Sequence, residues 1–280
     1  MCFFPNFTKR AGAGRFRRCP HLYKSTAEII EFQLFIVWKL RAAFFTAPAI
    51  IAATILMGSI SLVSSIWDRT GFTQHRIARV WSRMLLALGF VHCRVTGIEK
   101  LDLRRSYVLV ANHASYMDTP AVLSSVPLQF RFFAKKGLFS VPFMGWHLTR
   151  AGHLPVERDD PRASLKMMSE GAKMLRERGV SLLLFPEGGR TKKQMRPFRE
   201  GAAYIAIKAG VPAVPIALIN TRRILPMHSA MVRGGEIELH IGDPIETSGM
   251  TPHDRGRLNQ MLQDRVAAIV GETPTPEEVT

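Results

Sequence analysis

The chain has few cysteines, and their number and spacing bear on whether it forms disulfides or binds zinc. Its 280 residues contain only Cys2, Cys19 and Cys93. An odd number, without a C-x-x-C pair or a histidine at metal-ligand spacing, argues against a disulfide framework and against a zinc site. We therefore expect reduced cytoplasmic thiols and no bound metal. A chain of this length can bury the core of one large domain, or of one domain with an attachment.

Several motifs of familiar enzyme classes are also missing. The sequence has no G-x-S-x-G, no H-E-x-x-H, no Walker phosphate loop and no G-x-G-x-x-G. Their absence argues against a serine hydrolase of the usual kind, a zinc metalloprotease, a P-loop enzyme and a dinucleotide oxidoreductase. Basic residues interrupt the first apolar residues, so we do not expect a signal peptide.

Acidic residues are scarce. The chain has 22 Asp and Glu against 38 Lys and Arg, a formal net charge of +16. This surplus predicts an anionic partner, either nucleic acid, anionic lipid or a phosphorylated small molecule. Nucleic acid is the weakest of the three, because no stacking aromatics alternate with the arginines and no DNA-binding motif is present. Hydrophobic residues make up 47% of the chain, which argues against disorder of the whole chain.

Charged residues are absent from the 26 positions between Arg41 and Asp68. Residues 48–67 would form a helix of about 30 Å, long enough to cross a bilayer, if Pro48 takes the first turn. Residues 27–45 are also strongly apolar. Two helices that meet near Pro48 could instead form a hairpin within one leaflet, and basic residues at both ends fit that arrangement. The sequence leaves both arrangements open.

Residues 72–90 place apolar side chains at helical spacing, with arginines elsewhere around the axis. Basic amphipathic helices of this kind lie on anionic membranes or cover the core of a following domain, and one helix can do both. From residue 91 onward, short apolar runs alternate with amphipathic stretches. The expected strands are 91–97, 106–112, 130–135, 153–156, 180–188, 212–220 and 236–242, and the expected helices are 163–179, 200–210 and 251–271.

This alternation predicts an α/β fold: a mixed, largely parallel sheet flanked by helices, preceded by an N-terminal apolar helical membrane anchor. We expect a basic segment at residues 1–26, the helical anchor at 27–70, the α/β domain at 71–270 and a flexible tail at 271–280.

Two strand ends carry side chains suited to chemistry, at the edge where open α/β sheets bind ligands. At the first, the strand at 106–112 runs into His113, and Asp118 follows at the expected start of a helix. Asp118 can accept a hydrogen bond from Nδ1 of His113, which leaves Nε2 free to act as a general base. The alternative is a structural histidine and an aspartate that only caps its helix.

At the second, the apolar run at 180–185 leads into Phe185-Pro186-Glu187-Gly188-Gly189-Arg190. Glycines there allow the backbone to approach a ligand closely, and Arg190 offers the planar fork that suits a phosphate. A glycine-rich turn with solvated cations is the alternative.

We call these two strand ends, with the segments 112–118 and 185–190, the first and the second junction. Together they resemble motifs of the glycerolipid acyltransferase family, specifically the 1-acyl-sn-glycerol-3-phosphate acyltransferases. That family carries N-H-x-x-x-x-D and later F-P-E-G-T-R, and this chain matches both, with Gly189 in place of the threonine. Two further elements match in order, and the resemblance covers roughly residues 75–245. These elements are Gly152-His153-Leu154-Pro155-Val156-Glu157-Arg158, with Glu157 where aspartate is usual, and Val214-Pro215-Ile216.

The resemblance implies transfer of a fatty acyl group from acyl-carrier protein or coenzyme A to the sn-2 hydroxyl of lysophosphatidic acid, which gives phosphatidic acid. It implies no bound cofactor, no metal and no acyl-enzyme. His113 would be the catalytic base and Asp118 would orient it. The substrate-binding residues that it implies are Arg190 and Arg158, which would hold the phosphate, and Glu187 and Gly188, which would shape the pocket.

The resemblance also implies a place in the cell. An acceptor with one acyl chain stays in the bilayer, and acyl thioesters are made in the cytoplasm. We therefore expect a membrane protein with its active site on the cytoplasmic face, which in a bacterium is that of the inner membrane. The expected partners are lysophosphatidic acid, an acyl-carrier protein or coenzyme A thioester and an anionic membrane surface, with no nucleic acid.

Three alternatives stay open. Gly189 removes a hydroxyl near the expected phosphate site, so another lysolipid, such as lyso-ornithine lipid, is an alternative acceptor. A noncatalytic protein that binds anionic membranes through its charge is an alternative from a different class. A lipid hydrolase, in which His113 activates water, is the third. A glycerophosphate acceptor stays ahead because both Arg190 and Arg158 are present.

Overall fold

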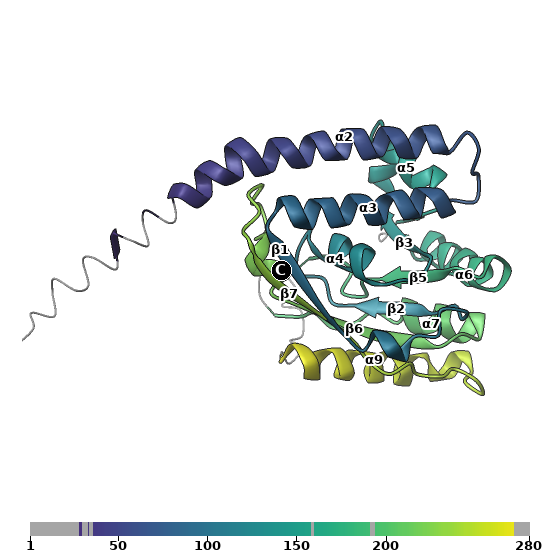
Figure 1. Cartoon of the computed structure of the whole chain (residues 1–280). Helices are drawn as coiled ribbons and strands as arrows, with labels where there is room; N and C mark the ends of the chain where they lie inside the picture. Colours follow the sequence, from purple (N-terminus) through teal and green to yellow (C-terminus); the bar gives the residue numbers. More distant parts are fainter. Residues whose placement is uncertain (1–27, 30–32, 34–35, 158–159, 191–193, 272–280) are drawn as a thin grey trace, which may run out of the picture. The chain divides into compact units, whose positions relative to one another are not determined.

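The computed structural model of the chain describes residues 28–29, 33, 36–157, 160–190 and 194–271. The chain divides into two units, Met1–Leu40 and Arg41–Thr280. The described residues of the first unit are helical, and the second unit contains the sheet (Figure 1). The expected basic segment at 1–26, the expected tail beyond residue 271 and Arg158 lie outside the described residues.

The described part of the chain forms a seven-stranded sheet in the order β1-β7-β6-β2-β5-β3-β4. The β6–β7 pair is antiparallel and the other paired neighbours are parallel. The predicted mixed, largely parallel sheet is therefore confirmed. The strands are β1 (Val91–Thr96), β2 (Val108–Ala111), β3 (Phe130–Lys135), β4 (Leu154–Val156), β5 (Ser181–Leu184), β6 (Ala213–Ile219) and β7 (Gly235–Ile241).

Helices cover both faces of the sheet and enclose one apolar core on each face (Figure 1). The central strand β2 shows why: Leu109 packs into one core and Val110 into the other, because successive side chains of a strand point to opposite faces. One face carries α3 (Phe72–Leu88) and α4 (Asp118–Ser125), and the other carries α6 (Pro161–Arg178), α7 (Gly201–Ala209) and α9 (Arg255–Val270).

The topology brings distant loops together at one edge of the sheet. β2 is paired with β5 on one side and with β6 on the other, and all three run in the same direction. Val110 of β2 pairs with Leu184 of β5, so these two strands end level with each other. The segments that follow β2 and β5 therefore start side by side, although they are far apart in the sequence.

The apolar helix continues through Pro48 without a turn. Residues Ile36–Ser64 form one helix of 29 residues with a mean hydropathy of 1.9, long and apolar enough to cross a membrane. It contains α2 (Ala47–Ser64) and a π-helical turn, η1 (Ala42–Thr46), that ends just before Pro48. A wider π turn accommodates a proline, which lacks an N–H and crowds the carbonyl one turn earlier. A hairpin near Pro48 is therefore wrong for the residues described.

α2 packs on the α/β domain through small side chains. Ala53 and Ser61 of α2 are buried, and small residues let helices approach closely. The Ser61 hydroxyl lies 2.8 Å from Nδ1 of His147 on α5 (Met144–Arg150), and the Trp81 indole N–H of α3 donates to the Thr54 hydroxyl at 3.0 Å. Several large apolar side chains of α2 are exposed, among them Ile51, Ile55, Leu56, Ile60 and Val63.

Two buried basic side chains, Arg131 and His75, lie near the start of α3. Arg131 of β3 is only 2% exposed, and its Nη2 donates to the Thr70 carbonyl at 3.2 Å. Burial is the main cause that lowers the pKa of Arg131 to about 10, and the positive charge of Arg178 is the second cause. His75 of α3 donates its Nε2–H to the Leu128 carbonyl at 3.1 Å. Burial, followed by the charge of Arg131, lowers the pKa of His75 to about 3.

His75→Gln is expected to weaken the dependence of stability on acid pH. The folded His75 takes up a proton only near pH 3, whereas its ordinary pKa is 6.5. The unfolded chain therefore binds more protons than the folded chain between these pH values. The contribution of neutral His75 to the unfolding free energy is fully present above pH 6.5 and is lost as the pH decreases toward 3. A glutamine keeps a donor for the Leu128 carbonyl but does not titrate.

The slope of the unfolding free energy against pH should decrease by about 1.4 kcal/mol per pH unit between about pH 6 and pH 4. Denaturant unfolding followed by tryptophan fluorescence measures this slope. His253→Gln, at an exposed histidine, is the control and should keep the wild-type slope. Equal slopes for His75→Gln and wild type would show that His75 does not contribute.

Candidate active site

His113 and Asp118 meet directly after β2. Asp118 is the first residue of α4, and its Oδ2 lies 2.7 Å from Nδ1 of His113, so the hydrogen bond predicted from the sequence is present. The Asp118 side chain is fully buried, whereas 16% of the His113 side chain is exposed. With the Nδ1 proton donated to Asp118, Nε2 keeps a lone pair that can accept a proton from a ligand.

The same carboxylate oxygen fixes the backbone of the loop. Oδ2 of Asp118 also accepts the N–H groups of Ala114 at 2.7 Å and Ser115 at 2.8 Å. Its other oxygen, Oδ1, has no hydrogen-bond partner among the described residues, so the side chain makes no capping bond to α4 there. The alternative in which Asp118 only caps its helix is therefore wrong, because the side chain points back toward the residues that precede it. One oxygen thus orients both the imidazole of His113 and the chain that carries it.

Phe185 stacks on the imidazole of His113. Their ring centroids are 4.1 Å apart and the planes differ by 20°. Phe185 follows β5, the neighbour of β2, so the stack joins the two junctions. Together with the bond to Asp118, it restricts rotation of the imidazole. The stack was not predicted from the sequence, where the available signal was an aromatic residue at the end of an adjacent strand.

Glu187 ties the two junctions together through backbone donors. It is 3% exposed; its Oε1 accepts the N–H of His113 at 2.6 Å and its Oε2 accepts the N–H of Arg196 at 3.0 Å. Gly188 follows in a left-handed conformation with φ +74°, and a Cβ there would lie 3.1 Å from Nε of Arg199. A side chain at this position would therefore be strained and crowded. These two predicted residues build the turn of the second junction.

Arg190 lies against the His113 loop, which we define as residues 113–118. Its guanidinium carbon is 3.4 Å from the centroid of the Tyr116 ring. The structure thus brings His113, Asp118, Glu187, Gly188 and Arg190 to the same edge of the sheet, as the sequence predicts. Arg158 lies outside the described residues.

Asn112 joins β2 to β6 at this edge. Its side-chain Nδ2 donates to the Leu218 carbonyl at 2.9 Å and its Oδ1 accepts the Leu218 N–H at 2.8 Å. The amide is 5% exposed, so these bonds satisfy a buried polar group and fix the point at which the chain leaves β2. Asn112 is the asparagine of the N-H-x-x-x-x-D pattern, which by itself does not indicate this contact with β6.

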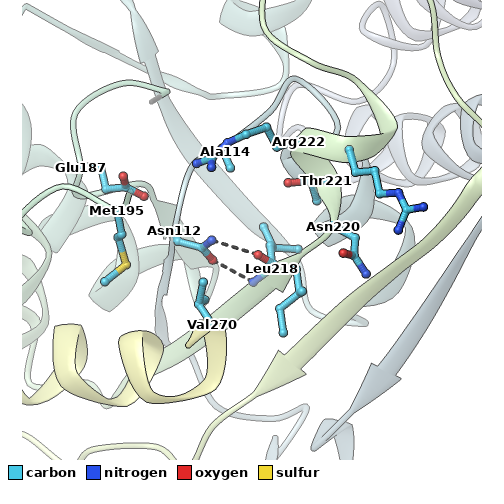
Figure 2. A pocket seen from close by; sticks show the side chains of 11 residues that line it. Asn112, Ala114, Glu187, Met195, Leu218, Asn220, Thr221, Arg222 and Val270 are labelled. Atoms are coloured by element: carbon cyan, nitrogen blue, oxygen red, sulfur yellow. Dashed lines mark hydrogen bonds between the residues drawn. The ribbon is translucent and has the colours of Figure 1, made fainter. Parts of the chain in front are cut away.

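A cavity of about 400 Å³ borders the His113 loop. Figure 2 shows the paired Asn112 and Leu218, with Glu187 and Met195 to one side and Arg222 near Ala114. Arg222 and Arg223 give the cavity cationic groups suited to an anionic ligand, and sequence reasoning missed both. Where the structure describes the chain, no three His, Cys, Asp or Glu residues gather as metal ligands.

The chain matches known proteins over the residues that build this site. Residues 92–219 match the family model described as Acyltransferase, which includes both junctions. Two chloroplastic relatives are each named 1-acyl-sn-glycerol-3-phosphate acyltransferase. The Brassica napus protein is 34% identical over 174 residues, 61% of this chain and 50% of its own. The Arabidopsis thaliana protein is 33% identical over 218 residues, 75% of this chain and 60% of its own.

The chain therefore spans half to three fifths of the length of these two relatives. The crystal structure of the 1-acyl-sn-glycerophosphate (LPA) acyltransferase PlsC from Thermotoga maritima has the same fold. It superposes with a TM-score of 0.70 at 24% identity, covering 84% of this chain and 96% of that chain. The family resemblance predicted from the four motifs is confirmed by these matches.

Asp118→Ala is expected to change the tautomer of His113. In the wild type, Oδ2 of Asp118 accepts the Nδ1 proton. Alanine offers no acceptor, so the proton is no longer held on Nδ1 and the tautomer with the proton on Nε2 gains population. Nitrogen NMR of protein labelled in its histidine rings measures the tautomer, and His113→Gln identifies the signal. An unchanged Nδ1–H signal in Asp118→Ala would contradict the assigned hydrogen bond.

Proposed function

We propose that the protein, whose residues 92–219 match the Acyltransferase family model, acylates the sn-2 hydroxyl of 1-acyl-sn-glycerol-3-phosphate. The donor is an acyl thioester and the product is phosphatidic acid. The hydrogen bond between His113 and Asp118, beside the cation of Arg190, is the observation that carries the proposal. It gives one edge of the sheet a base for a hydroxyl and a cation for a phosphate. The names of the two plant relatives support the same acceptor.

His113 acts as the general base. Its Nε2 takes the proton from the sn-2 hydroxyl while the hydroxyl oxygen attacks the carbonyl carbon of the thioester. The new C–O ester bond forms, and the C–S bond breaks with its electron pair going to sulfur. The thiolate then takes up the proton from Nε2 and leaves as a thiol. Asp118 keeps Nδ1 protonated and stabilises the imidazolium that forms between these steps. The thiol carrier is coenzyme A or the acyl-carrier protein.

Ser115 supports direct transfer without an acyl-enzyme. Although it lies in the His113 loop, its side chain is 1% exposed and its hydroxyl donates to the Leu225 carbonyl at 2.8 Å. It also accepts the Met117 N–H at 3.1 Å. A buried hydroxyl that already donates one hydrogen bond and accepts another is held away from a substrate. Ser115 is therefore a structural residue and not a nucleophile.

Arg190 holds the acceptor phosphate. Its guanidinium offers N–H groups in a planar fork that matches phosphate oxygens. We assign Arg158 to the same phosphate on the sequence pattern alone. Glu187 and Gly188 act indirectly, because they shape the turn from which Arg190 extends.

α2 lies in one leaflet of the membrane and does not cross it. Thr54 of α2 is bonded to α3 and Ser61 of α2 lies in hydrogen-bond contact with α5. One side of α2 therefore contacts protein and not lipid. Its exposed side is apolar, and the neighbouring helix α3 exposes Arg76 and Arg83, which suit anionic headgroups. The active site then faces the cytoplasm, where the acyl thioesters are made.

His113→Ala is expected to reduce acyl transfer to 1-acyl-sn-glycerol-3-phosphate by about 10²- to 10⁴-fold, because the variant lacks the general base. The assay separates phosphatidic acid from free fatty acid and uses the purified protein with acyl-coenzyme A and acyl-carrier protein in turn. His92→Ala, at an exposed histidine of β1, is the matched control and should keep the wild-type rate. Equal rates for His113→Ala and wild type would sink the proposal.

The same assay tests the alternatives. Free fatty acid released without an acceptor would identify a hydrolase. Preferred transfer to lyso-ornithine lipid would identify a different acceptor. Membrane binding without any turnover would identify a noncatalytic protein.

The double variant Ile51→Glu, Ile55→Glu is expected to bind anionic vesicles at least about tenfold more weakly per substitution, since each removes a large apolar side chain from the lipid-facing side of α2. Flotation with vesicles of phosphatidylglycerol and phosphatidylethanolamine measures the binding. The control Leu165→Glu changes an equally exposed residue of α6, on the other face of the sheet, and should bind as the wild type does. Unchanged binding by the double variant would argue against contact of this side with lipid.

A further inference from the structure

The Tyr116 ring holds the guanidinium of Arg190 although it contributes nothing to the core. Tyr116 is 56% exposed, and the guanidinium carbon of Arg190 lies 3.4 Å from its centroid. Within the described part of the chain, Arg190 makes no hydrogen bond or ion pair to another side chain. The two residues come from different junctions, the loops after β2 and β5. Among the residues that the structure describes, the ring is therefore the contact that holds this cation in place.

The backbone on both sides of Tyr116 is anchored. Ser115 is buried and bonded to the Leu225 carbonyl, and Met117 is 2% exposed with its N–H bonded to the Ser115 hydroxyl. Three residues before Tyr116, the ring of His113 is bonded to Asp118. With both neighbours pointing inward, Tyr116 points outward from a restrained loop. Its ring therefore has a fixed position relative to the imidazole.

We propose that Tyr116 is a positioning residue, which sets the distance between the phosphate-binding Arg190 and the base His113. A stack uses the face of the guanidinium and leaves its in-plane N–H groups free for phosphate oxygens. Gly189 has no side chain that could restrain Arg190, so the ring supplies the restraint. This inference rests on the proposed function, because it assumes an acceptor with a phosphate.

It follows that the site selects acceptors by the distance between their hydroxyl and their phosphate. The base belongs to the restrained His113 loop, and the Tyr116 ring of the same loop holds the cation that extends from the other junction. The spacing between the acceptor's hydroxyl and its phosphate must therefore match a fixed distance. An acceptor with the correct spacing needs no rearrangement of the site. Loss of the ring leaves Arg190 chemically intact but free to move, so binding of the phosphate weakens while the chemistry at His113 is unchanged.

The test measures KM for 1-acyl-sn-glycerol-3-phosphate and kcat in Tyr116→Phe and Tyr116→Leu. Tyr116→Phe keeps the aromatic face and should behave as the wild type does. Tyr116→Leu should raise KM about two- to fivefold, the usual strength of an exposed cation–π contact, with kcat unchanged. Tyr204→Leu is the matched control, since the Tyr204 ring faces Lys208 within α7 and should leave both constants unchanged.

A second pair of variants shows whether Tyr116 acts through Arg190. In an Arg190→Ala background, Tyr116→Leu should cause no further rise in KM. An equal rise in both backgrounds, a change in kcat instead of KM, or a Tyr116→Phe variant as weak as Tyr116→Leu would each overturn the inference. A wild-type protein that does not acylate this acceptor would instead overturn the proposed function. Transfer by the wild type that is impaired by Arg190→Ala but not by Tyr116→Leu would overturn this inference alone.

Discussion

The convergence of three N–H donors on one buried oxygen, Oδ2 of Asp118, is the constraint on which the rest of the site depends. Burial of a carboxylate is costly unless hydrogen bonds compensate for the lost water, so the His113 loop adopts the one shape that supplies those donors. The shape then determines where every other group of the loop goes. Ser115 and Met117 turn inward, Tyr116 turns outward, and Nε2 of His113 remains open to a ligand.

Parallel pairing of β2 with β5 and β6 extends this constraint to the whole edge of the sheet. The backbone of His113 is bonded to Glu187 and its ring is stacked on Phe185, both beyond β5. On the other side, Asn112 is bonded to Leu218 of β6. His113 and the chain that carries it are therefore held by contacts that involve three strands, and the guanidinium of Arg190 joins the same assembly through Tyr116. The site is a property of the sheet edge and not of one motif.

The sequence predicted those features that depend on local periodicity or on a short motif. Alternating apolar runs located the strands, and the spacing of His113 and Asp118 predicted their hydrogen bond. The strand order, the stack of Phe185 and the contact of Tyr116 with Arg190 depend on partners far away in the chain, which no local pattern specifies. The hairpin near Pro48 was wrong for a different reason. A proline usually ends a helix, but a π turn lets the helix continue, and sequence periodicity does not reveal that turn.

The bonds between Asn112 and Leu218 join residues 106 positions apart. During translation, the apolar helix leaves the ribosome before any strand of the sheet, whereas β2 cannot gain its β6 neighbour until residue 218 has been synthesised. The nascent chain can thus reach the bilayer while its reactive histidine still lacks a fixed surrounding. For the proposed acylation of a membrane lipid, catalytic competence would then arise only in a chain that has already reached the membrane, which separates delivery from activation in time.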